Sequence, residues 1–121
     1  MIRVLVADDQ ALVRGGFSVL IDSDPGLEVV GEASNGAEAV ELAAREQPDA
    51  VILDFLMPKL SGLDALKAMR ERGLPMPAVL LTAISDSSIR EMEDVPAPEA
   101  ILEKPFRRRD IEKALELATH A

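Results

Sequence analysis

The sequence predicts an α/β fold in which helices cover both faces of a parallel β-sheet. Short apolar runs alternate with helical patterns along all 121 residues, which is typical of a sheet built from successive β/α units. The run at 50–53 is apolar at every position, as expected for a central parallel strand buried on both faces. We therefore expect one domain of five β/α units that fills the chain.

The first unit is expected to consist of a strand at Ile2–Ala7 and a helix at Ala11–Asp22. Two glycines, Gly15 and Gly16, weaken that helix by about 1 kcal/mol each relative to alanine. We interpret them as allowing close packing. The apolar face of the helix is predicted to consist of Val13, Phe17, Leu20 and Ile21.

Turn residues separate the next elements. Asp24-Pro25-Gly26 is typical of a turn and precedes a strand at Leu27–Ala33. Ser34-Asn35-Gly36 opens a second helix that runs to about Gln47, where Pro48 stops it. The third strand is expected at Ala50–Leu53.

The second half of the chain continues the alternation. Ser61 is a good N-cap for a third helix that ends at Gly73. A fourth strand is expected at Ala78–Thr82, followed by a short helix at 86–94 and an irregular Pro-containing connection at 95–98. The last strand is expected at about Ala100–Glu103 and the last helix at 107–118.

Composition excludes several classes of function. The net charge of -9 gives the domain no general attraction for DNA or anionic membranes, and 2% aromatic residues argue against base stacking. The absence of cysteine excludes disulfides and thiolate metal sites. No segment is long enough to span a bilayer. We expect a small, acidic, cytoplasmic domain that binds neither nucleic acid nor membrane by itself.

Charged and hydroxyl side chains follow the apolar runs. Asp8 and Asp9 follow the first run, Asp54 the third, Thr82 ends the fourth and Lys104 follows the last. The carboxyl ends of parallel strands meet at one edge, where ligands bind in open α/β sheets. Three acids repel one another unless a cation lies among them, which predicts Mg²⁺. The lysine and threonine indicate an anionic group beside the metal, most simply a phosphoryl group.

Each of these residues has an ordinary reading when it is taken alone. Asp8-Asp9 is then more typical of a solvated turn, Thr82 of a β-branched strand residue and Lys104 of a surface lysine. Their common position favours a site. A carboxylate at Asp54, flanked by Mg²⁺ and an ammonium group, is a plausible nucleophile for phosphoryl transfer.

These residues carry a resemblance to a known family. Asp8-Asp9, Asp54 with Met57-Pro58 and Gly62, Thr82-Ala83, and Lys104-Pro105-Phe106 occur in that order. The pattern resembles the receiver domain of bacterial two-component response regulators, over essentially the whole chain. The segment 2–14 resembles most closely the branch with a C-terminal helix-turn-helix output domain of the LuxR/FixJ type.

The resemblance implies a fold and a site. The fold is the flavodoxin-like, doubly wound (βα)5 arrangement with strand order 2-1-3-4-5, and residues 1–121 form the receiver without an output domain. Asp54 is the implied phospho-acceptor. The implied Mg²⁺ ligands are Asp9, Asp54 and the backbone carbonyl of Leu56, with Asp8 acting through water. The phosphoryl oxygens are held by Thr82, the backbone N–H of Ala83 and Lys104.

The resemblance also implies partners. A cognate histidine kinase supplies the phosphoryl group, and the domain is not an enzyme but catalyses its own phosphorylation and dephosphorylation. The output is expected to be transcription, through a DNA-binding domain absent from this chain. A homodimer through the fourth and fifth helices is a further hypothesis, in which the arginines at 107–109 pair with acids of a second subunit. The expected fourth helix carries the acids Glu91, Glu93 and Asp94.

Three departures from the family pattern affect switching. The connection at 95–98 replaces the usual end of the fourth helix, so we expect that helix to be short or frayed. Ile101 stands where the family usually has an aromatic residue, so we do not expect the usual coupling between threonine and aromatic side chain. Leu56 and Ile84 are apolar, and we expect them to hinder the attacking water and prolong the life of the phosphoryl-aspartate. The alternative function is a receiver that binds proteins independently of phosphorylation.

Other enzyme classes do not fit. A dinucleotide or flavin site needs a loop rich in glycine or hydroxyl groups after the first strand, where this chain has Asp8-Asp9-Gln10. Phosphatases of the haloacid-dehalogenase type need an Asp-x-Asp pattern there. The single histidine, His120, lies at the C-terminus, which excludes a Ser/His triad.

Overall fold

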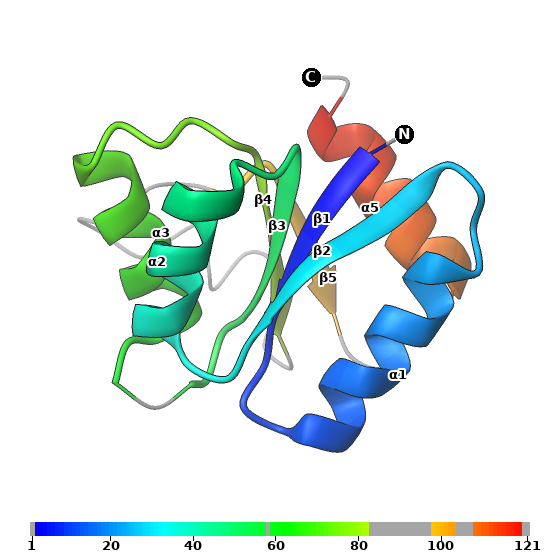
Figure 1. Ribbon diagram of the computed structural model, residues 1–121, viewed down its shortest axis with the longest axis horizontal. Coiled ribbons are helices and arrows are strands. Elements are labelled where there is room, and N and C mark those ends of the chain that lie inside the picture. Colours follow the sequence, from blue (N-terminus) through cyan, green and yellow to red (C-terminus); the bar gives the residue numbers. More distant parts are fainter. Residues whose placement is uncertain (1, 58, 83–97, 104–107, 120–121) are drawn as a thin grey trace.

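A five-stranded parallel sheet in the order β2-β1-β3-β4-β5 forms the centre of the molecule (Figure 1). The computed structural model describes residues 2–57, 59–82, 98–103 and 108–119. The predicted α/β class and strand order are confirmed. In the described part of the chain the elements are β1 (Ile2–Ala7), α1 (Ala11–Asp22), β2 (Leu27–Ala33), α2 (Gly36–Glu46), β3 (Ala50–Asp54), α3 (Gly62–Glu71), β4 (Ala78–Thr82), β5 (Ala100–Glu103) and α5 (Arg108–Thr119).

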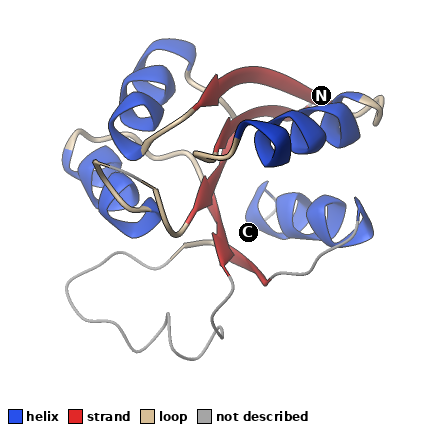
Figure 2. Cartoon of the chain, turned by 90° about the horizontal axis from the view of Figure 1, so that it is seen from below, coloured by secondary structure: helices blue, strands red, loops and turns tan. Residues whose placement is uncertain are grey.

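Helices lie on both sides of the sheet, with α2 and α3 on one face and α1 and α5 on the other (Figures 1 and 2). Successive residues of a strand point to opposite faces, so each inner strand contributes to two separate apolar layers. In β3, Leu53 packs in the layer under α2 and α3, and Ile52 in the layer under α1 and α5. Every residue of β3 and of β4 is buried. The prediction of a central strand buried on both faces is confirmed.

The apolar face of α1 is narrower than predicted. Phe17 and Ile21 are buried and Val13 is half-buried in the layer under α1 and α5, but Leu20 is 37% exposed and does not belong to that layer. The interpretation of Gly15 and Gly16 was wrong. Apart from the neighbouring backbone of α1 itself, no described atom lies within 4 Å of a Cβ built at either residue, so they permit no close approach of another described element there.

Three boundaries differ slightly from the sequence prediction. β3 extends to Asp54, because that residue pairs with Leu81 in the neighbouring strand. The third helix ends at Glu71, and Gly73 follows in the left-handed region at φ 76° while its N–H donates to the Arg70 carbonyl. The last helix is described from Arg108 onward. The short helix expected at 86–94 and most of the connection at 95–98 lie outside the described residues.

Side chains cross-link the amino edge of the sheet. The Arg70 guanidinium donates to the carbonyls of Leu74 and Met76 and to Glu99 Oε1, at 2.8 to 3.0 Å. The same Glu99 oxygen accepts the N–H of Ala78, the first residue of β4. The end of α3 and the start of β4 are thereby joined to the residue before β5. This network lies opposite the carboxyl edge, where the predicted site residues lie.

Helix α2 begins with a reciprocal cap. The Asn35 side chain accepts the N–H of Glu38 at 2.8 Å, and Glu38 Oε1 accepts the N–H of Ser34 at 2.8 Å. We expect Asn35→Ala to lower the free energy of unfolding by about 1 kcal/mol, because one helix N–H loses its partner. Urea denaturation followed by circular dichroism measures this loss. An unchanged midpoint would show that water replaces the cap without penalty.

Within the described part of the chain, no helix has the length and apolar character needed to cross a membrane.

Candidate metal and phospho-acceptor site

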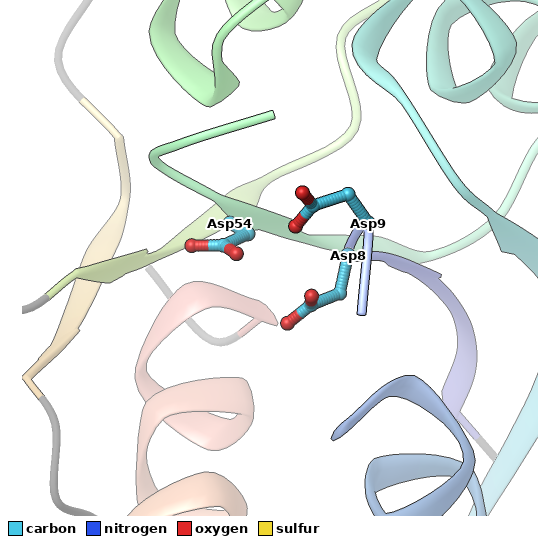
Figure 3. A group of neighbouring side chains, drawn as sticks. All are labelled: Asp8, Asp9 and Asp54. Atoms are coloured by element: carbon cyan, nitrogen blue, oxygen red, sulfur yellow. The ribbon is translucent and has the colours of Figure 1, made fainter. Parts of the chain in front are cut away.

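Three carboxylates from two neighbouring strands gather at the carboxyl edge of the sheet. Asp8 and Asp9 follow β1, and Asp54 ends β3, which pairs directly with β1. One carboxylate oxygen from each residue lies within 4.8 Å of the others. Figure 3 shows the three side chains around a common space. The sequence prediction that these acids meet at one edge is therefore confirmed.

The surroundings of Asp8 leave one of its oxygens available. Its N–H donates to the Ala33 carbonyl at 3.0 Å, and its Oδ1 accepts the N–H of Gln10 at 2.8 Å. The residue is 2% exposed, yet Oδ2 has no hydrogen-bond partner among the described residues. A buried carboxylate oxygen without a partner is energetically costly. This atom therefore points to a ligand that the protein binds here.

Asp54 is nearly as buried as Asp8, with 6% of its surface exposed, whereas Asp9 is exposed. Phe55, the next residue, donates its N–H to the Leu81 carbonyl at 2.8 Å and so extends the pairing of β3 with β4. Thr82, 1% exposed, is the last residue of β4. The sheet thus places Thr82 and Asp54 at the ends of adjacent strands, as the sequence predicts.

The donor set fits a hard divalent cation. Mg²⁺ binds oxygen ligands at about 2.0–2.1 Å, so two direct ligands lie at most about 4.2 Å apart. The three carboxylate oxygens lie within 4.8 Å of one another, close enough to surround one such cation. Together with the unpartnered Asp8 oxygen, this fit identifies the cluster as a candidate Mg²⁺ site.

Glycines control how closely the loop after β3 approaches the cluster. A Cβ built at Gly62 would lie 2.4 Å from the Asp54 carbonyl oxygen, and one built at Gly36 would lie 2.2 Å from the Leu60 carbonyl oxygen. The Gly62 N–H also donates to the Phe55 carbonyl at 2.9 Å. Only glycine allows these contacts without displacing backbone. The loop carrying Leu56 is therefore held against both Asp54 and the start of α2.

Other predicted site residues are placed only in part. Ala83 and Lys104, predicted to hold phosphoryl oxygens, lie outside the described residues, and so does Ile84. Leu56 lies two residues beyond Asp54, and its side chain is 71% exposed. The role of its carbonyl as a ligand stays a prediction. Ile101 is half-buried and packs against the apolar layer under α2 and α3.

The comparison with known families decides the identity of this fold and site. Residues 4–116 match the family described as the response regulator receiver domain. The chain belongs to this family. The resemblance noted in the sequence is confirmed at that level, and the acids Asp8, Asp9 and Asp54 form the acidic pocket of this receiver.

Two relatives match almost the full length of this chain. The chain is 41% identical over 116 residues to the transcriptional regulatory protein PdtaR of Mycobacterium tuberculosis, covering 96% of this chain and 56% of PdtaR. It is 35% identical over 120 residues to the transcriptional regulatory protein LiaR of Bacillus subtilis, covering 98% of this chain and 56% of LiaR. This receiver therefore spans about half the length of both regulators.

A solved structure shows the same fold. The chemotaxis protein CheY4 of Vibrio cholerae superposes with a TM-score of 0.85 at 30% identity, covering 98% of both chains. The flavodoxin-like arrangement with order 2-1-3-4-5, which the sequence resemblance implied, is thereby confirmed.

Sequence reasoning missed one residue at the site. Arg14, in the first turns of α1, donates from Nη1 to the backbone carbonyl of Asp8 at 2.7 Å and from Nε to Glu32 at 3.2 Å. An arginine one helical turn after an acidic pair was the available signal. The pattern alone could not show which carbonyl it meets.

The predicted dimer contacts are described only at α5. Arg107 and the acids at 91–94 lie outside the described residues. Arg108 pairs with Glu112 of its own helix at 3.2 Å, so one of the three arginines already has a partner within the chain. Such exposed pairs contribute little to stability, and the dimer stays a hypothesis.

Proposed function

We propose that this receiver accepts a phosphoryl group on Asp54 from a histidine kinase in a Mg²⁺-dependent reaction. The observation that carries the proposal is the juxtaposition of a buried strand-end carboxylate, Asp54, with Asp9 and the unpartnered oxygen of Asp8. Asp8 and Asp9 can help to hold a cation beside Asp54, the carboxylate proposed to take up the phosphoryl group. The family to which the chain belongs supports the same assignment.

In the proposed reaction, a carboxylate oxygen of Asp54 attacks the phosphorus of a phosphohistidine. The new O–P bond forms as the P–N bond breaks, and the electron pair of that bond returns to the imidazole nitrogen, which then takes up a proton. Bound Mg²⁺ supplies positive charge that offsets the charge of the phosphoryl oxygens. Asp9, Asp54 and the Leu56 carbonyl are proposed to hold the cation, with Asp8 acting through a bound water.

Three further groups are proposed to hold the phosphoryl oxygens of the product. They are the Thr82 hydroxyl, the Ala83 N–H and the Lys104 ammonium. The Thr82 hydroxyl donates a hydrogen bond, and the ammonium pairs with the negative oxygens. Repacking around these groups then changes the surface that a downstream partner meets.

We propose transcription as the controlled process, because two relatives are named transcriptional regulatory proteins. The chain spans 56% of their length, and we propose that DNA binding belongs to a domain outside this receiver. The output branch with a LuxR/FixJ-type domain is proposed on the sequence of 2–14. A cytoplasmic location follows from the proposed kinase partner.

Intact mass after incubation with Mg²⁺ and acetyl phosphate tests the proposed acceptor. We expect the wild type to gain one phosphoryl group and Asp54→Asn to gain none, because an amide cannot form the acyl phosphate. Asp49→Asn is the matched control: Asp49 directly precedes the same strand at its amino end and lies outside the acidic cluster. It should be phosphorylated like the wild type.

Two outcomes would contradict the proposal. Equal phosphorylation of Asp54→Asn and wild type would place the acceptor elsewhere. No adduct on a wild type that binds Mg²⁺ would favour the alternative, a receiver that binds proteins independently of phosphorylation.

A further inference from the structure

Arg14 connects three elements at the edge of the acidic site. It lies on α1, its Nε pairs with Glu32 of β2 at 3.2 Å, and its Nη1 donates to the carbonyl of Asp8 at 2.7 Å. Only 20% of its side chain is exposed, against 43% for Glu32. An arginine held by a carboxylate on one side presents its remaining N–H groups in a fixed direction.

The contact with Arg14 adds to other hydrogen bonds that hold Asp8 in place. Its N–H is bound to the Ala33 carbonyl, its own carbonyl to Arg14, and its Oδ1 to the Gln10 N–H. Within the described chain only Oδ2 is left without a partner. Ala33 directly follows Glu32, so the β2 end fixes Asp8 both directly and through Arg14. With the backbone held from both sides, the direction of the carboxylate is set before any ligand arrives.

We propose that Arg14 is a positioning residue that orients the Asp8 carboxylate for Mg²⁺. This inference rests on the proposed function of the acidic site but concerns the binding of the cation alone. Replacing a group that hydrogen-bonds to a metal ligand without touching the metal typically lowers metal affinity by about 10- to 100-fold. Among the described residues, the Arg14 side chain contacts this site through the Asp8 backbone carbonyl, so we expect it to act on the cation and not on the phosphoryl group.

The direction in which Mg²⁺ affinity changes when Arg14 is replaced distinguishes a positioning role from a purely electrostatic one. Removing the positive charge of Arg14 near three acids would, by charge alone, make Mg²⁺ bind more tightly. Loss of the contact to the Asp8 carbonyl would make it bind more weakly. A structural role without positioning would lower stability and leave the affinity of the folded protein unchanged.

Titration with MgCl₂, followed by ¹⁵N–¹H NMR on the unphosphorylated protein, tests the inference. We expect Arg14→Met to raise the Mg²⁺ dissociation constant roughly tenfold, and Arg14→Lys, which keeps the charge and one donor, to restore part of the affinity. Arg72→Met is the matched control, because Arg72 pairs with Glu41 at 2.9 Å beyond the far end of α3. Its dissociation constant should equal that of the wild type.

A second pair of variants covers the case in which Arg14→Met does not fold. Glu32→Gln removes the partner that orients Arg14, and Glu28→Gln removes the same charge four residues earlier on β2. At about 0.15 M salt, where charges further than about 8 Å are largely screened, Glu32→Gln should weaken Mg²⁺ binding and Glu28→Gln should not. The inference is overturned if Arg14→Met binds Mg²⁺ as tightly as the wild type or more tightly. It is also overturned if the two glutamate variants bind Mg²⁺ equally, or if the wild type does not bind Mg²⁺. Mg²⁺ binding without phosphorylation overturns only the proposed acceptor function.

Discussion

Gly62→Ala is expected to destabilise this receiver by about 1–3 kcal/mol, although alanine normally stabilises a helix relative to glycine. The added Cβ would lie 2.4 Å from the Asp54 carbonyl oxygen and 2.9 Å from Leu80 Cδ1. The Leu80 side chain can turn away, but the Asp54 carbonyl belongs to the buried end of β3 and cannot move without disturbing the strand pairing with Leu81. The variant should therefore also bind Mg²⁺ more weakly than the wild type.

Gly16→Ala is the matched control for this substitution. Gly16 is also a helical glycine, but a Cβ added there would have no described atom outside the neighbouring backbone of its own helix within 4 Å. Alanine at this position should raise the free energy of unfolding by about 0.4–1 kcal/mol. The two variants are compared by urea denaturation with circular dichroism, since the chain has no Trp or Tyr for fluorescence. Stabilisation of similar size at both positions would refute the close contact at Gly62.

The second large effect is the dependence of stability on Mg²⁺. A ligand that binds only the folded state, present at 100 times its dissociation constant, stabilises that state by about 2.7 kcal/mol. We expect the wild type to show a gain of this size, measured as a rise in Tm on adding MgCl₂ in excess over EDTA. The physical reason is that the cation neutralises three carboxylates whose oxygens lie within 4.8 Å of one another.

Asp9→Asn should largely remove the dependence of Tm on Mg²⁺. The substitution removes one charge from the acidic cluster and little packing, because Asp9 is exposed. Its Tm without Mg²⁺ should therefore exceed that of the wild type, and added Mg²⁺ should change it much less. Asp49→Asn, which leaves the cluster intact, should keep the full response. A wild type whose Tm is insensitive to Mg²⁺ would contradict the metal site itself.

The elements and the acidic cluster were predictable from local patterns. Ala50–Leu53 is a short run without polar residues, and Asp54 follows it directly. Since every strand is parallel, residues that follow strands meet at one edge whatever the details of packing. The site therefore followed from the positions of Asp8, Asp9 and Asp54 in the sequence, without any knowledge of side-chain contacts.

The failures of prediction all depend on which atoms meet across the fold. Gly16 and Gly62 look alike in the sequence. A Cβ added at Gly62 would collide with the Asp54 backbone, whereas one added at Gly16 would meet no described atom outside its own helix. Leu20 belongs to the apolar stripe of α1 but lies beyond the edge of the contact with the sheet. Arg14 could have met many acceptors within reach of its long side chain. Such pairings are set by tertiary packing, which periodicity does not encode.

The network around Arg70 and Glu99 has a mechanical consequence. Because one guanidinium and one carboxylate join the end of α3, the start of β4 and the residue before β5, these elements cannot slide past one another at the amino edge without breaking several charged hydrogen bonds together. We therefore expect any rearrangement that follows phosphorylation of Asp54 to leave this amino edge in place. The opposite, carboxyl edge is then where we expect the domain to change shape.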